Sequence, residues 1–125
     1  MLRALRDVMA LSEAIRQQID EAAARVRVGF PGWLRPFLMR DVIAITLGRR
    51  VYISPRLLER GTEAVEPIVR HELAHVRQVA RLGLLRFLYQ YVRDYAALRR
   101  GGLSPAEAYR AIPFEMEAKE AEKGA

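Results

Sequence analysis

The only two histidines of this chain lie within residues 71–75, whose sequence is HELAH. In a helix, residues four positions apart lie on the same face, so His71 and His75 can direct their imidazole rings to one point. Two imidazoles placed in this way can hold one Zn²⁺, and Glu72 can reach a water molecule on the metal. The spacing therefore predicts two metal ligands and a general base on one helix.

A zinc site of this kind needs a third protein ligand from elsewhere in the chain. The chain has no cysteine and no further histidine, so an Asp or a Glu must provide it. Glu115 is the best candidate, because Pro113 restrains its backbone and Phe114 can anchor the helix that it begins. Glu117 is the alternative. We expect one Zn²⁺ per chain, held by the two histidines and this glutamate.

The chemistry that these residues permit is hydrolysis of a peptide bond in a peptide or protein substrate. Zinc lowers the pKa of a bound water to about 7 and polarises a carbonyl group. Glu72 would accept the water proton and pass it to the leaving amine. Catalysis also needs a donor near the carbonyl oxygen, and the sequence does not decide between Tyr91, Tyr95, Tyr109 and Arg110.

Five predicted elements must position these residues within a single domain, because a chain of 125 residues has room for one hydrophobic core. We predict an α+β fold that is mainly helical, with a small β-hairpin packed on the motif helix. The elements are an amphipathic helix over residues 1–28, a hairpin over 42–53, the motif helix over 68–82, a helix over 84–98 and a glutamate-bearing helix over 113–123.

The N-terminal helix is predicted from apolar residues that recur every three or four positions and end at Gly29, with Ser12 as the one polar exception. The recurring positions are Leu5, Val8, Ser12, Ile15, Ile19, Ala22 and Val26. We expect this stripe to cover the back of the core. A membrane-surface anchor and a removable pro-segment are the alternatives.

The remaining helices are predicted from their caps and apolar faces. Pro67 is placed in the first turn of the motif helix, and Ser54 and Ser104 begin two short helices. The helix over 84–98 is expected to bury Leu84, Leu88, Tyr91, Val92 and Tyr95. Apolar packing in an irregular or short helical connection is expected for Trp33, Phe37 and Met39.

The net charge of +6 raises the question of nucleic-acid or membrane binding. The arginines are scattered over polar faces rather than clustered, so we interpret them as a solvated basic surface and expect no nucleic-acid partner. No stretch reaches the length of about 18 apolar residues that a transmembrane helix needs, which leaves only weak contact with a membrane surface open. Without a secretory pattern at the N-terminus, we expect a cytoplasmic protein.

The stretch HELAHVRQ at 71–78, followed by EMEA at 115–118, resembles the gluzincin metallopeptidases. It is most similar to the minigluzincins and to the catalytic cores of the HtpX and CAAX-prenyl-protease type, over residues 42–123. The resemblance implies a zincin-like fold with Glu115 as the third ligand and residues 51–53 as the strand that pairs with an extended substrate. Related families carry Asp four residues after the glutamate ligand, where this chain has Lys119. The substitution implies that a histidine lacks a carboxylate partner.

Two further interpretations compete with a peptidase. One is a non-catalytic zinc-binding module of the same fold that binds a peptide partner or an anionic surface. The other, a basic helical nucleic-acid binder, depends on net charge alone. A latent peptidase, whose cleft the N-terminal helix or residues 120–125 would cover, is also open, and the oligomeric state is not predicted.

Overall fold

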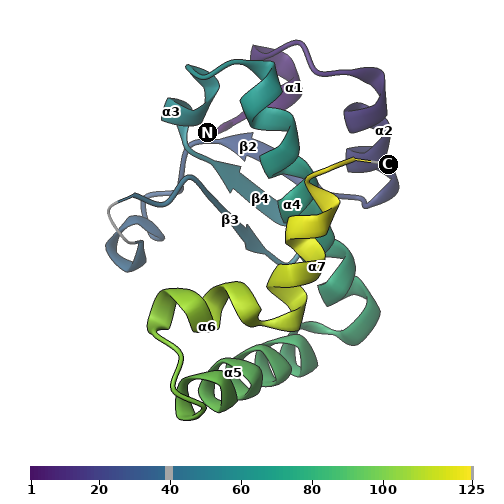
Figure 1. The fold of residues 1–125 in the computed structure, drawn as a ribbon. Helices are drawn as coiled ribbons and strands as arrows, with labels where there is room; N and C mark the ends of the chain where they lie inside the picture. The colour runs from purple at the N-terminus through teal and green to yellow at the C-terminus, as the bar shows by residue number, and fades with distance from the viewer. Residues whose placement is uncertain (39–40, 125) are drawn as a thin grey trace.

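The computed structural model describes residues 1–38 and 41–124, and the chain forms a mainly helical α+β fold with a four-stranded mixed sheet (Figure 1). The strands are β1 (Arg3–Ala4), β2 (Arg25–Val28), β3 (Ala44–Leu47) and β4 (Arg50–Ile53). The helices are α1 (Leu5–Val8), α2 (Glu13–Glu21), the 3₁₀ turn η1 (Arg35–Phe37), α3 (Pro55–Leu58), α4 (Thr62–Leu82), α5 (Leu84–Arg100), α6 (Pro105–Ala111) and α7 (Pro113–Ala121). No described helix is both long enough and apolar enough to cross a membrane.

The predicted hairpin over residues 42–53 is confirmed as the antiparallel pair of β3 and β4. Gly48 makes the turn with a φ of +64°, a left-handed conformation that glycine adopts without steric cost. The strand order is β1-β2-β4-β3, so β4 is central and β3 is an edge strand. β4 pairs with β2 in parallel on its other side.

The prediction of one helix over residues 1–28 is wrong. This segment forms two strands and two short helices, with Ser12 as the N-cap of α2. Ala23 has a φ of +52° and ends α2, and the alternating Arg-Val-Arg-Val of β2 then pairs with β4. The apolar stripe misled the prediction because three separate elements, α1, α2 and β2, bury its members, among them Leu5, Ile15, Ile19 and Val26.

The motif helix α4 is longer than predicted, because it begins at Thr62 rather than at residue 68 and includes Pro67. Proline lacks the N–H that would bond back to the preceding turn, so tertiary contacts must hold the turns before it. Val65 is fully buried there, and the Glu66 carboxylate accepts hydrogen bonds from the backbone N–H and the hydroxyl of Ser12 at 2.7 and 3.0 Å.

The core lies between α4 and the sheet, with α2 completing it. Val65, Val69, Leu73 and Val76 follow one another at helical spacing and are almost fully buried. They belong to the same cluster as the inner residues of β4. Because this face of α4 is fixed against the sheet, the two histidines of the motif lie on another face of the same helix.

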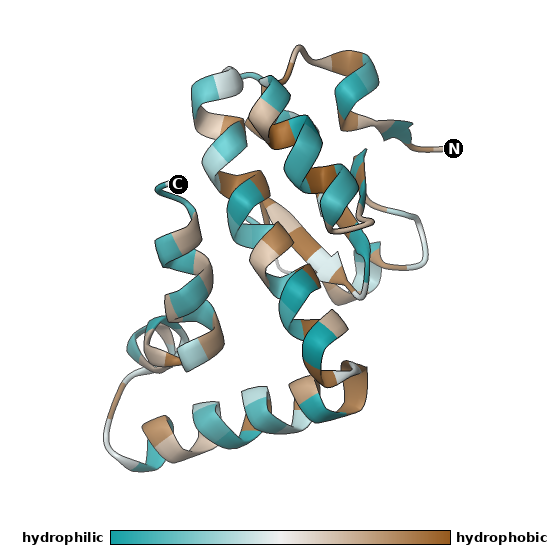
Figure 2. Cartoon of the chain, turned by 90° about the vertical axis from the view of Figure 1, so that its right-hand side faces the viewer, coloured by the Kyte–Doolittle hydropathy of each residue, from teal (hydrophilic) through white to brown (hydrophobic). Residues whose placement is uncertain are grey.

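Helices α5, α6 and α7 lie beside and below α4 rather than on the sheet, and Figure 2 shows α5 crossing the foot of the molecule. The prediction that α5 buries an apolar face is wrong: none of its residues, all of which the structure describes, is buried. Leu84 and Val92 are exposed. α5 contacts α4 and α6, and its Phe87 ring stacks on Phe114 with the ring centroids 4.8 Å apart.

In the connection between β2 and β3, two aromatic side chains that were expected to be packed are exposed. Trp33 and Phe37 are 62% and 80% exposed, so neither provides the apolar packing predicted for it. Among the described residues of this segment, Leu34 is the buried one. The prediction for Met39 falls outside the described residues.

The short helices predicted after Ser54 and Ser104 are confirmed as α3 and α6, and Ser104 forms a complete capping box with Glu107.

Candidate metal centre

The structure brings Glu115 of α7 against both histidines of α4. One carboxylate oxygen, Oε1, lies 3.1 Å from His71 Nε2 and 3.2 Å from His75 Nε2. Each residue offers one ligand atom, and these atoms all lie within 4.8 Å of one another. The three side chains thus form a set of nitrogen and oxygen donors that could hold a metal ion.

The spacing of these donors fits a small tetrahedral cation. Ligands bound to zinc at 2.0–2.1 Å in a tetrahedron lie about 3.3 Å apart, close to the two distances between the histidines and Glu115. The three side chains are 16%, 10% and 6% exposed, in the order His71, His75, Glu115. They are therefore shielded from bulk water on most sides.

The tautomer of His75 follows from its neighbour Gln78, which is fully buried. The Gln78 amide nitrogen donates to the Phe114 carbonyl at 3.0 Å and to Glu117 at 2.9 Å. Its oxygen must therefore face His75 Nδ1, at 2.9 Å, and accept a hydrogen bond from it. With a proton on Nδ1, Nε2 faces the Glu115 oxygen; it donates a hydrogen bond to that oxygen when the ring is protonated and offers its lone pair when the ring is neutral. Glu117, the alternative ligand, orients Gln78 instead.

His71 is oriented by a carboxylate that the sequence analysis missed. Glu122 Oε2 lies 2.7 Å from His71 Nδ1. A carboxylate only accepts hydrogen bonds, so Nδ1 is the donor and Nε2 faces Glu115. The expectation that Lys119 leaves a histidine without a carboxylate partner is wrong, because Glu122 supplies it from one turn further along the chain. The spacing of seven residues from Glu115, two helical turns, was the available signal.

The two histidines and Glu115 shift one another's pKa values. Burial opposes protonation of both histidines, but hydrogen bonds to Glu115, and the charges of Glu72 and Glu115, raise the pKa of each above its ordinary value. Burial also works against ionisation of Glu115, yet hydrogen bonds from the two histidines hold the pKa of this carboxyl well below its usual range. Two imidazole nitrogens and a carboxylate thus attract positive charge to their centre, as protons or as a metal ion.

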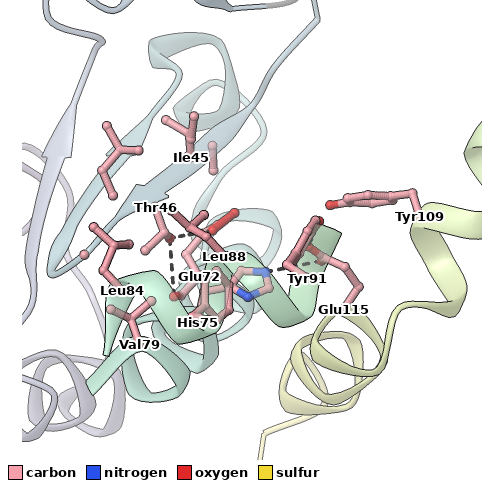
Figure 3. A pocket seen from close by; sticks show the side chains of 14 residues that line it. Ile45, Thr46, Glu72, His75, Val79, Leu84, Leu88, Tyr91, Tyr109 and Glu115 are labelled. Atoms are coloured by element: carbon pink, nitrogen blue, oxygen red, sulfur yellow. Dashed lines mark hydrogen bonds and ion pairs between the residues drawn. The ribbon is translucent and has the colours of Figure 1, made fainter. Parts of the chain in front are cut away.

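Two tyrosines complete the surroundings of Glu115. The Tyr91 hydroxyl of α5 donates to Glu115 Oε2 at 2.6 Å, so the second carboxylate oxygen is held away from the histidines. Tyr109 of α6 points toward the same region (Figure 3). Burial and the charge of Glu115 raise the pKa of both phenols, so both stay protonated and can act as donors. Tyr95 and Arg110, the other predicted donors, are not among the residues that line the cleft.

Glu72, the predicted general base, is buried beside this cluster and is fixed by the sheet. The Thr46 hydroxyl of β3 donates to Glu72 Oε2 at 2.7 Å. Glu72 Oε1 receives no hydrogen bond from a described residue that the structure records. The contact with Thr46 joins the motif helix to the edge strand, and Thr46 is a site residue that no sequence motif identified.

A cleft of about 560 Å³ opens over these residues (Figure 3). β3 forms one wall, α4 the floor, and α5 and α6 the opposite wall, with Glu72, His75 and Glu115 at the bottom. Its apolar lining includes Ile45, Leu47, Val79, Leu84, Phe87 and Leu88. Leu84 and Leu88, expected in the core, are thus walls of the cleft. No described N-terminal residue before Ala44 lines it, and none of residues 120–124 does.

The strand expected to pair with a substrate, residues 51–53, is wrongly assigned. β4 is hydrogen-bonded on both sides, to β2 and β3, so its backbone has no free edge. β3 is the strand that lines the cleft. The Ser54 N–H donates to the Ile43 carbonyl at 2.8 Å, and in an antiparallel ladder alternate residues bond to the same neighbour. The backbone N–H and C=O groups of Ala44 and Thr46 therefore point to the open side of β3.

A family model described as the eCIS core domain matches residues 39–83. That span includes β3, β4 and the whole of α4, with the two histidines, Glu72 and Thr46, but it ends before Glu115. Neither a curated protein nor a solved structure matches the chain. The chain is thus similar to the eCIS core domain over about a third of its length.

Proposed function

We propose that this protein is a zinc-dependent peptidase of the gluzincin type, with His71, His75 and Glu115 as the zinc ligands and Glu72 as the general base. The observation that carries the proposal is the convergence of both Nε2 atoms on one oxygen of Glu115. Both tautomers are set by acceptors on Nδ1, so this convergence leaves a position for a cation. Histidine nitrogens with one carboxylate are a donor set of catalytic zinc.

A zinc ion bound there would activate a water molecule and polarise a substrate carbonyl. The Glu72 carboxylate, held by Thr46, is placed to accept the proton of that water and to deliver it to the leaving amine. Tyr109 projects from the opposite wall and can donate a hydrogen bond to the carbonyl oxygen as negative charge develops on it. Tyr91 is the weaker candidate for that donor role, because its proton is engaged by Glu115.

The substrate in this proposal is an extended polypeptide that adds to the sheet along β3. The outward backbone groups of Ala44 and Thr46 offer an antiparallel partner its main-chain hydrogen bonds. Thr46 lies directly beside Glu72, so a peptide paired with β3 passes over the general base. Substrate side chains near the scissile bond would meet apolar walls contributed by α4 and α5.

The decisive experiment compares the wild type with Glu72→Gln. Protein purified without chelator is expected to contain about one zinc per chain, and Glu72→Gln should keep the zinc and lose cleavage of unfolded protein and of mixed peptides. Glu63→Gln, an exposed glutamate on the same helix, is the matched control and should retain both.

Two outcomes would contradict the proposal in different ways. A wild-type chain that contains no zinc, and whose thermal stability is insensitive to added zinc, would exclude the metal site. A chain that binds zinc but gives no cleavage dependent on Glu72 would instead favour the non-catalytic zinc-binding module. The exposed apolar residues of α5 and the basic net charge support that second candidate as a partner-binding protein.

A further inference from the structure

We propose that Glu122 is a positioning residue for the metal site: it fixes the orientation of His71 and raises the affinity of the site for zinc, and Arg70 and Lys119 hold it in place. The proposal rests on the proposed function only in that the site binds zinc. It does not depend on peptide cleavage.

Glu122 reaches His71 because of its register on α7. It directly follows the last residue of that helix and keeps a helical backbone, with φ −61° and ψ −26°. Seven residues separate it from Glu115, so the two carboxylates lie on nearly the same face, about 20° apart. Ala118 lies between them and is fully buried, which lets α7 approach α4 closely.

The contacts of Glu122 join the end of α7 to the motif helix α4. Its Oε2 accepts from His71 Nδ1 at 2.7 Å, and its Oε1 accepts from Lys119 Nζ at 3.2 Å. The Arg70 guanidinium donates twice to the Glu122 carbonyl, from Nε at 3.1 Å and from Nη2 at 2.8 Å. Because Arg70 directly precedes His71, the same turn of α4 holds both the backbone and the side chain of Glu122.

The two histidines therefore have partners of different charge. His75 Nδ1 donates to the neutral amide of Gln78, whereas His71 Nδ1 donates to an ionised carboxylate. A negative acceptor makes an imidazole a better electron donor to a metal and holds its ring in one orientation. The Glu122 side chain is 18% exposed, so water screens the interaction less than it screens a surface pair. Loss of Glu122 should weaken the His71 ligand in particular.

The experiment measures zinc affinity by competition with a chelating dye at about pH 8, where proton competition at histidine is small. Glu122→Ala should bind zinc about 10- to 100-fold more weakly than the wild type, and Glu122→Gln, which keeps an oxygen acceptor without the charge, should fall between them. Glu120→Gln is the matched control. Glu120 is 73% exposed and pairs with Lys123, so its variant should bind zinc as the wild type does.

A second measurement is spectroscopic and begins with the wild type. In zinc-loaded wild-type protein, the proton spectrum of the two imidazoles should show a His71 Nδ1 proton far downfield and protected from exchange, as expected for a hydrogen bond to a carboxylate. This signal should move upfield in Glu122→Gln, while the His75 signal stays in place. A merely structural role of Glu122 would not shift one imidazole proton selectively.

The outcomes separate this proposal from the proposed function. Equal zinc affinity in wild type and Glu122→Ala, or a His71 Nδ1 proton that exchanges freely in the wild type, would overturn the role of Glu122 and leave the peptidase proposal standing. A wild-type chain that binds no zinc would overturn both. Zinc binding weakened in Glu122→Ala, without any cleavage by the wild type, would support Glu122 and contradict the peptidase.

Discussion

Single hydrogen bonds decide which atom of each site residue faces the cluster. Gln78 and Glu122 occupy the Nδ1 atoms of the two histidines, and Tyr91 occupies Oε2 of Glu115. The remaining atoms, two Nε2 and one Oε1, are then the ones that meet. One oxygen of Glu72 is engaged in the same manner: the Thr46 hydroxyl donates to Oε2, which leaves Oε1 to accept a hydrogen bond from a water molecule.

Thr46→Val should separate the role of this hydrogen bond from metal binding. Valine has nearly the same shape as threonine but no hydroxyl, so the Glu72 carboxylate would lose its only side-chain donor among the described residues. We expect kcat to fall about 10-fold or more with unchanged zinc content, as is typical when a supporting partner of a site residue is removed. Thr46→Ser restores the hydroxyl and should recover most of the activity. Equal kcat values in the valine variant and the wild type would argue against a role for Thr46.

At the scale of elements, the site lies where an edge strand passes over the motif helix. β4 is engaged on both sides, which leaves β3 as the strand with outward backbone groups along the cleft. α7 runs antiparallel to α4, so that its first turn meets His75 and its end meets Arg70. α5 and α6 add the second wall without joining the core.

Ala44→Pro tests substrate pairing along β3. The Ala44 N–H points away from β4, so proline removes no bond of the sheet and remains compatible with an edge strand. A substrate would lose one main-chain hydrogen bond, worth about 1 kcal/mol, and kcat/KM should fall about fivefold with unchanged zinc affinity. Ala44→Ser keeps the N–H and is the control. Thermal unfolding must be similar in both variants, and full activity of a folded Ala44→Pro would exclude pairing at this position.

At the scale of the whole molecule, the cluster links metal binding to stability. The proposed zinc site joins α4 to α7, and a ligand that binds only the folded chain would stabilise it by mass action. In the metal-free protein the histidines have raised pKa values, so their protonated forms stabilise the fold. That contribution is fully present below the unfolded pKa of about 6.5 and is lost as the pH rises through the higher folded values.

We therefore expect the stabilising effect of zinc to grow with pH. Between about pH 6 and pH 8 the metal-free chain should lose stability while zinc competes with fewer protons, so the difference in Tm between zinc-loaded and chelator-treated protein should increase. Thermal unfolding at a series of pH values measures it. His71→Gln and His75→Gln should reduce both the difference and its pH dependence. A Tm difference that shrinks over this range would contradict the assigned ionisation.

The sequence alone determined the local features of this protein. The i, i+4 spacing of the histidines, the β-branched hairpin and the caps at Ser54 and Ser104 depend on neighbours a few residues away, and the structure has them where they were predicted. The preference for Glu115 over Glu117 was also available from the sequence, because Pro113 places Glu115 in the first turn of its helix.

Only the tertiary structure decided the rest, because it depends on contacts between distant segments. Residues 1–28 have helical periodicity, yet pairing of β2 with β4 turns part of them into strands and makes β3 the edge. The partners of the site residues are set in the same way. Thr46 lies 26 residues from Glu72, and Glu122 lies 51 residues from His71. Contacts over such sequence separations cannot be predicted from a local pattern, because they arise from the packing of α4 against β3 and α7.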